Sequence, residues 1–208
     1  MASTIIHLAI AKNLKDKLEI DNTKDYYLGS IAPDISKQIG INKSISHFSF
    51  NNRSNVPNIN LFVKRYPTFK YNSFNLGYFI HLYTDKIWDE EFIPKITNQT
   101  NIIKLLDGSI INSTKEEISN LLYSDYTNLN ISIIDEYNLD LSLFYEDFTI
   151  PDTPLNEIPV NKLDILINKV GIIIENSKQE KQYTIDINII KLFIEETTNK
   201  ILEELKKY

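Results

Sequence analysis

The chain has 208 residues, a formal net charge of -6 and no cysteine, so disulfides and thiolate metal sites are excluded. Its length and its hydrophobic content of 42% are enough for one sizeable core, and its acidic charge disfavours general attraction to nucleic acid or anionic membranes. Because only 5 glycines and 7 prolines interrupt the chain, we expect long helices in an all-α fold, with a single domain over residues 1–208.

The first helix is predicted to begin at Ser3 or Thr4 and to run to about Leu18, with His7 turned toward the core. The N-terminal stretch lacks a basic leader and a small-residue cleavage site, so we expect no signal peptide. No apolar run approaches the roughly 18 residues of a membrane span. We therefore expect a cytoplasmic protein that is not integral to a membrane.

A short helix followed by a loop is predicted for residues 21–34. Pro33 fixes its own φ and favours an extended conformation of the residue before it, so Asp34 is expected at a stiff corner. Residues 36–58 are polar and predicted to be irregular, and they contain His47.

Two further helices are predicted for residues 57–69 and about 72–92, and the second is expected to be the central helix of the fold. Apolar residues cover nearly all its sides, which is typical of a buried helix. It also carries an imidazole and a carboxylate one turn apart, at His81 and Asp85. Both groups are costly to bury without partners, and a shared metal ion is one reason to find them there.

The second half of the chain, residues 96–208, is expected to pack as helices against a metal-site half formed by residues 1–95. We do not count its Ile-rich runs as strands, because isoleucine is abundant throughout the chain. Three prolines predict a loop near residues 147–160. A capping box and helical periodicity predict helices for residues 113–123, 161–176 and 184–207.

All three histidines lie in the first 81 residues, at His7, His47 and His81. His81 and Asp85 can reach one ion from successive helical turns, and imidazole suits zinc because its pKa of about 6.5 leaves it mostly neutral at pH 7. His47 and Asp34 are the donors expected to complete the shell. Since a carboxylate has two oxygens, Asp85 can also serve a second ion beside His7.

Four segments each contain one or two of these candidate metal ligands: STIIH at residues 3–7, LGSIAPD at 28–34, SHF at 46–48 and LGYFIHLYTD at 76–85. In this order they resemble the zinc-dependent phospholipase C family, and the resemblance covers roughly residues 1–92. That family is similar in fold to the single-strand-specific zinc nucleases. The resemblance implies an all-α fold and a cluster of metal ions that hydrolyses phosphate esters.

Residue by residue, the resemblance implies that Asp34, His47, His81 and Asp85 hold one zinc ion and that His7 joins Asp85 at a second. Asp34 matches the carboxylate proposed in the family as general base or as the holder of the nucleophilic water.

The family also has later histidines, with an HxxxE helix pair, for a third metal, whereas no histidine follows His81 here. A third site is therefore missing or built from oxygens, in which case Asp125 is a candidate ligand. Oxygen-rich ligation suits Mg²⁺, Mn²⁺ or Ca²⁺ better than zinc.

These patterns predict a metal-dependent phosphoric ester hydrolase with one or two zinc ions, acting on a small phosphate ester or a phospholipid headgroup. One alternative is a non-catalytic helical protein in which an ion only connects the segments. Another is a metal-dependent nuclease or nucleotide phosphohydrolase, although stable nucleic-acid binding is not expected without a basic, aromatic groove. The residues also have plainer interpretations, since His81 with Asp85 can be a buried hydrogen-bonded couple and Asp34 a helix cap.

Overall fold

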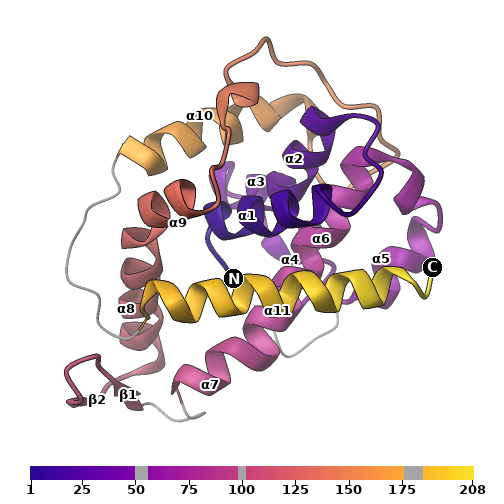
Figure 1. Cartoon of the computed structure of the whole chain (residues 1–208). Helices are drawn as coiled ribbons and strands as arrows, with labels where there is room; N and C mark the ends of the chain where they lie inside the picture. Colours follow the sequence, from indigo (N-terminus) through magenta and orange to yellow (C-terminus); the bar gives the residue numbers. More distant parts are fainter. Residues whose placement is uncertain (50–55, 98–101, 176–184) are drawn as a thin grey trace.

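The computed structural model describes residues 1–49, 56–97, 102–175 and 185–208, and these ranges are mostly helical (Figure 1). The all-α fold class is therefore confirmed. The first half contains α1 (Thr4–Lys15), α2 (Thr23–Ile31), η1 (Ala32–Asp34), α3 (Ile35–Gln38), α4 (Lys43–Ser46), α5 (Ile59–Arg65), η2 (Phe69–Tyr71), α6 (Ser73–Ile87), η3 (Trp88–Phe92) and α7 (Ile93–Thr97). The second half contains β1 (Ile102–Lys104), β2 (Ile110–Asn112), α8 (Lys115–Asn128), α9 (Asn130–Glu136), η4 (Ser142–Phe144), η5 (Val160–Lys162), α10 (Leu163–Glu175) and α11 (Ile187–Leu205).

Helix α6 is the buried central helix, and its closest neighbour is α2. Two glycines allow the two backbones to touch. A Cβ added at Gly77 would lie 2.1 Å from the carbonyl oxygen of Tyr26, and one added at Gly29 would lie 2.1 Å from that of Phe74. This close approach sets the distance between α2 and the face of α6 that carries the candidate metal ligands.

The expected helix 72–92 corresponds to α6 followed by one π-helical turn, η3, before α7 continues. Asn72 caps the start, because its side chain accepts a hydrogen bond from the backbone N–H of Asn75. In the π turn Trp88 and Phe92 are buried against each other and against Phe193 of α11. Such turns often occur at functional sites, and this one follows Asp85 by three residues.

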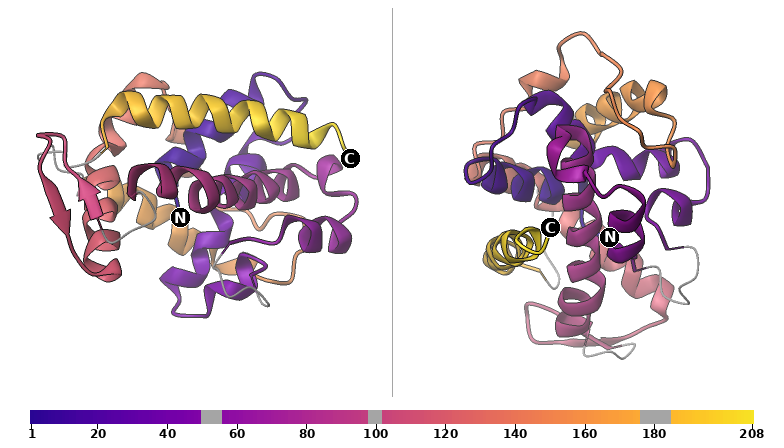
Figure 2. Two further views of the ribbon diagram at one scale, coloured as in Figure 1. Left: turned by 90° about the horizontal axis from the view of Figure 1, so that it is seen from below. Right: turned by 90° about the vertical axis from the view of Figure 1, so that its right-hand side faces the viewer.

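Helix α11 covers α1 and α6 along its length, as the views in Figure 2 show. Its first turn is capped by Asp186, whose side chain accepts from the backbone N–H of Ile189. One face of the helix is buried, and its residues follow the 3.6-residue period. The buried residues are Ile190, Phe193, Ile194, Thr197, Thr198, Ile201 and Leu205.

The prediction that no Ile-rich run forms a strand is wrong after α7. Strands β1 and β2 pair antiparallel, with Ile103 opposite Ile111, and Ile103 is fully buried. Gly108 closes the turn in the left-handed region, at φ 85°, a conformation that glycine adopts without strain. Turn chemistry and one buried isoleucine therefore stabilise a hairpin that composition did not indicate.

Element boundaries differ from the predictions by a few residues. Helix α1 ends at Lys15, before Leu18, and residues 36–58 include the short helices α3 and α4, where an irregular chain was predicted. Helix α8 begins with the predicted capping box but continues to Asn128. The predicted ends at residues 176 and 184, and part of the predicted irregular stretch (residues 50–55), lie outside the described residues. None of the helices within the described ranges is long and apolar enough to cross a bilayer.

Candidate metal centre

Five side chains from four elements meet beside the middle of α6. His81 and Asp85 come from successive turns of α6, His7 from the first turn of α1, Asp34 from the end of η1, and His47 from the residue after α4. The side chains of His7, His81 and Asp85 are fully buried, and that of His47 is 3% exposed. The chain thus places its three histidines and two aspartates in one interior cluster.

Asp85 is the centre of this cluster. Its Oδ2 lies 3.5 Å from Nε2 of His47 and 3.5 Å from Nε2 of His81. Its Oδ1 lies 3.3 Å from Nε2 of His7 and accepts a hydrogen bond of 3.0 Å from the backbone N–H of Ala2. The carboxylate therefore uses both oxygens, one toward each side of the cluster.

The remaining distances close the cluster. Nε2 of His47 lies 3.9 Å from Oδ1 of Asp34 and 3.3 Å from Nε2 of His81. The rings of His7 and His81 stack with their centroids 3.8 Å apart. Two groups of three residues can each offer ligand atoms that all lie within 4.8 Å of one another. One group is His7, Asp34 and His81, and the other is His47, His81 and Asp85.

Several of these atoms are buried without a hydrogen-bond partner. They are both ring nitrogens of His7 and Oδ2 of Asp85. Nε2 of His7 lies 3.3 Å from Oδ1 of Asp85 but forms no hydrogen bond with it. Unsatisfied buried polar atoms are rare and costly. Imidazole nitrogens and carboxylate oxygens are ligands that zinc accepts, so the cluster fits a zinc ion both in donor chemistry and in its unsatisfied atoms.

Local electrostatics favour the metal-binding protonation state of Asp85 and His7 but not that of His81. Burial by itself favours the neutral form of Asp85, but the neighbouring imidazoles of His47 and His7 outweigh it and hold the pKa of Asp85 well below its usual value. Burial and the neighbouring His81 lower the pKa of His7. Burial opposes the charged form of His81 too, yet the two carboxylates Asp85 and Asp34 raise its pKa overall. A charged Asp85 and a neutral His7 can bind a cation without first losing a proton.

Outer hydrogen bonds orient two of the imidazoles. Nδ1 of His81 lies 2.9 Å from the carbonyl oxygen of Ser30, which leaves Nε2 directed at Asp85. Nδ1 of His47 lies 2.9 Å from Oγ of Ser46 and 3.1 Å from the carbonyl oxygen of Lys43. Partners of this kind fix the tautomer of a metal-ligating histidine and raise its basicity.

The sequence reasoning did not identify these supporting groups. Ser30 and Ser46 lie inside the LGSIAPD and SHF segments, so proximity to a candidate ligand was the available signal. Tyr78 of α6 is a third supporting residue: its hydroxyl donates to the carbonyl oxygen of Ser46 and so holds the end of α4 against α6.

Asp125 lies elsewhere. It is fully buried in α8, and its Oδ2 accepts a hydrogen bond of 2.9 Å from the backbone N–H of Ile185, just before α11. It belongs to neither three-residue ligand group found among the described residues. Its observed contact is structural, and a role as an additional metal ligand stays a prediction.

Solvent reaches the cluster from one side. The side chain of Asp34 is 13% exposed, the largest value among the five candidate ligands, and that of His47 follows at 3%. Both residues belong to the stretch from η1 to the end of α4. The part of the cluster in contact with solvent is therefore the part formed by this stretch.

Comparison with known protein families gives one match. The family model described as zinc dependent phospholipase C matches residues 5–138, well over half of the chain, and this range contains all five clustered side chains. Comparisons with curated proteins and with solved structures gave no match. The order of the four motifs, the buried cluster of imidazoles and carboxylates, and this match agree, and the chain belongs to the zinc-dependent phospholipase C family.

Proposed function

We propose that the protein is a zinc-dependent phosphoester hydrolase that acts on a phospholipid headgroup or a related small phosphate ester. The observation that carries the proposal is the convergence of five ligand-type side chains, several of whose buried atoms have no other partner. In this proposal Asp34, His47, His81 and Asp85 hold one ion, and His7 with Asp85 holds a second.

The residues have distinct tasks in such a site. A bound zinc ion supplies Lewis acidity toward a phosphate oxygen and toward water. Asp34, whose carboxylate is the most exposed of the cluster, is placed to hold a water molecule and accept its proton. Ser30 and Ser46 hold the imidazoles of His81 and His47 in the orientation that binding requires.

Partial exposure of Asp34 also bears on the structural alternative. A purely structural zinc site is closed by four protein ligands, whereas a catalytic site keeps one position open. With four protein ligands the first ion fits the structural description, so the open positions of the proposed site would belong to the second ion at His7 and Asp85. The partial exposure of Asp34 lets water reach the cluster, which supports the catalytic alternative. Because His81 uses Nδ1 for the hydrogen bond to Ser30, only its Nε2 is free, and it can ligate one ion at a time.

The experiment measures metal and activity on the same samples. Purified protein is analysed by elemental mass spectrometry and assayed on a soluble short-chain phosphatidylcholine and on a generic phosphodiester. We expect stoichiometric zinc, hydrolysis that stops with a chelator, and loss of both zinc and activity in His81→Ala. Asp186→Asn at the start of α11 is the matched control, because an asparagine side chain can also accept the hydrogen bond from the backbone N–H of Ile189. Bound zinc without hydrolysis of any substrate would favour the structural alternative, and a protein that binds no zinc would refute the proposal.

A further inference from the structure

The segment that borders the open side of the metal centre exposes apolar side chains. Ile41 and Ile45 are each 41% exposed, and they lie on the turn before α4 and on α4 itself. His47, one of the two candidate ligands reached by solvent, follows Ile45 by two residues. Single exposed isoleucines are ordinary, but two beside the entrance to a site mark a surface that can be covered by a partner.

The same segment has a charge opposite to that of the whole chain. Residues 35–49 contain Lys37 and Lys43 and no acidic residue, although the protein has a net charge of -6. Neither lysine forms an ion pair with another side chain in the described ranges. The Nζ of Lys37 donates to the hydroxyl of Tyr123 and that of Lys43 to Sδ of Met1. Because a lysine ammonium group has three N–H donors, each can still donate to an anionic group outside the protein.

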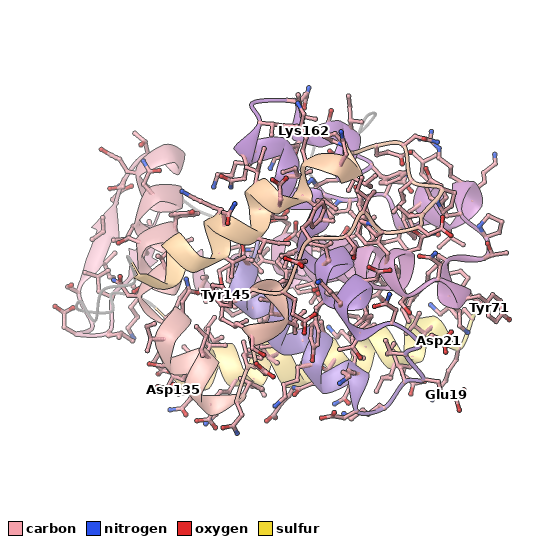
Figure 3. All side chains as sticks on the ribbon, turned by 90° about the horizontal axis from the view of Figure 1, so that it is seen from above. Glu19, Asp21, Tyr71, Asp135, Tyr145 and Lys162 are labelled. Carbon is pink, nitrogen blue, oxygen red and sulfur yellow. The ribbon has the colours of Figure 1, made fainter. Side chains whose placement is uncertain are left out.

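Neighbouring elements continue this charge pattern. Helix α10 packs against α3, and residues 160–171 carry Lys162 and Lys169 with Asp164 as their one acid. In Figure 3, Lys162 lies at the upper edge of the molecule, whereas Glu19 and Asp135 lie at its lower edge.

An aromatic side chain extends the surface onto α8. The Nζ of Lys37 lies 4.6 Å from the ring centroid of Tyr123, which is 48% exposed. Tyrosine has an apolar ring and a polar hydroxyl, and it is enriched where membranes meet water. Lysine stems can lie on apolar surface while the charged end reaches phosphate groups.

We propose that Lys37, Ile41, Lys43, Ile45 and Tyr123, which we name the entrance surface, dock the protein on a phospholipid bilayer with the metal centre facing the headgroups. The inference rests on the proposed function, because it explains how a buried cluster meets a lipid that stays in its bilayer. The isoleucines and the tyrosine enter the interface, and the lysines bind lipid phosphates. Docking places the exposed edge of Asp34 toward the membrane.

The test measures sedimentation of the protein with vesicles of phosphatidylcholine containing a minority of phosphatidylglycerol. The wild-type protein is expected to bind these vesicles, and Ile41→Asp with Ile45→Asp is expected to lower the partition coefficient by about tenfold or more. Lys37→Gln and Lys43→Gln are each expected to lower it about fivefold, and added salt should lower binding of the wild type in the same way. Ile110→Asp on the hairpin is the matched control, because Ile110 is 67% exposed on a different element.

Hydrolysis assays on the same variants separate this inference from the proposed function. The double isoleucine variant should cleave soluble short-chain phosphatidylcholine at the wild-type rate but lose activity on vesicles. If all variants bind vesicles like the wild type, or if Ile110→Asp alone lowers binding, the entrance surface is refuted while the hydrolase can stand. If the wild type binds no vesicles, the docking proposal fails. If vesicle binding depends on the two isoleucines but no substrate is cleaved, the docking surface is supported and the hydrolase is refuted.

Discussion

The contact between α2 and α6 predicts a strong effect for Gly77→Ala. A Cβ at this position would lie 2.1 Å from the carbonyl oxygen of Tyr26 and 2.8 Å from the backbone nitrogen of Ser30. These atoms belong to backbone, which cannot rotate away as a flexible side chain can. Reaching ordinary contact at 3.4 Å requires α2 to move by about 1.3 Å, or α6 to bend by as much.

The expected cost combines three effects. Overpacking costs about 1–3 kcal/mol, and the intrinsic preference of alanine for helix offsets about 1 kcal/mol of it. The same movement lengthens the hydrogen bond between His81 and the carbonyl of Ser30 from 2.9 Å to about 4 Å, which costs about 1 kcal/mol more. We therefore expect the free energy of unfolding to fall by roughly 1–3 kcal/mol and zinc affinity to fall about 10–100-fold, because His81 loses its orienting partner.

Urea unfolding of the metal-free protein and zinc titration against a chromogenic chelator measure the two effects separately. Gly171→Ala on α10 is the matched control, since a Cβ there meets only the Tyr145 hydroxyl, at 3.6 Å. This control should be neutral or more stable by up to about 1 kcal/mol and should bind zinc normally. The reasoning is refuted if Gly77→Ala matches the control in stability and in zinc affinity.

Three further predictions concern the hydrogen bonds of Ser46, Asp125 and Tyr66. Ser46→Ala removes the hydroxyl beside Nδ1 of His47 and should weaken zinc binding by about tenfold or more in the chelator titration. Unchanged zinc affinity would mean that the Lys43 carbonyl alone orients the ring. Asp125→Ala leaves the buried N–H of Ile185 unpaired and should lower the free energy of unfolding by about 1–3 kcal/mol with no change in bound zinc; lost zinc would instead make Asp125 a ligand. Burial, and to a lesser extent a hydrogen bond to Glu157, raises the pKa of Tyr66 from 10.0 to about 12. Because the folded state holds this proton more tightly than the unfolded state, the free energy of unfolding should fall as the pH rises from 10 toward 12. In urea unfolding at these pH values, Tyr66→Phe should show a smaller fall.

The sequence by itself determined the features that depend on neighbours along the chain. Helical period and few breakers predicted the all-α class and the central helix, and the four-residue spacing put His81 and Asp85 on one face of α6. The order of four motifs led to the family that the family model then matched over residues 5–138. These signals are readable because helical geometry is local and repeats every 3.6 residues.

Only the tertiary structure decided which side chains and backbone groups from distant parts of the sequence come into contact. The approach of α2 to α6 puts the Ser30 carbonyl beside His81, 51 positions apart, and no local pattern encodes that contact. The same holds for the hydrogen bond that Asp125 accepts from the N–H of Ile185, 60 positions away, which no local pattern predicts. The β-hairpin escaped prediction because its stability comes from a glycine turn and from one isoleucine that finds the core. Such contacts result from packing of the whole chain, in which burial of apolar surface places polar groups where they must find partners.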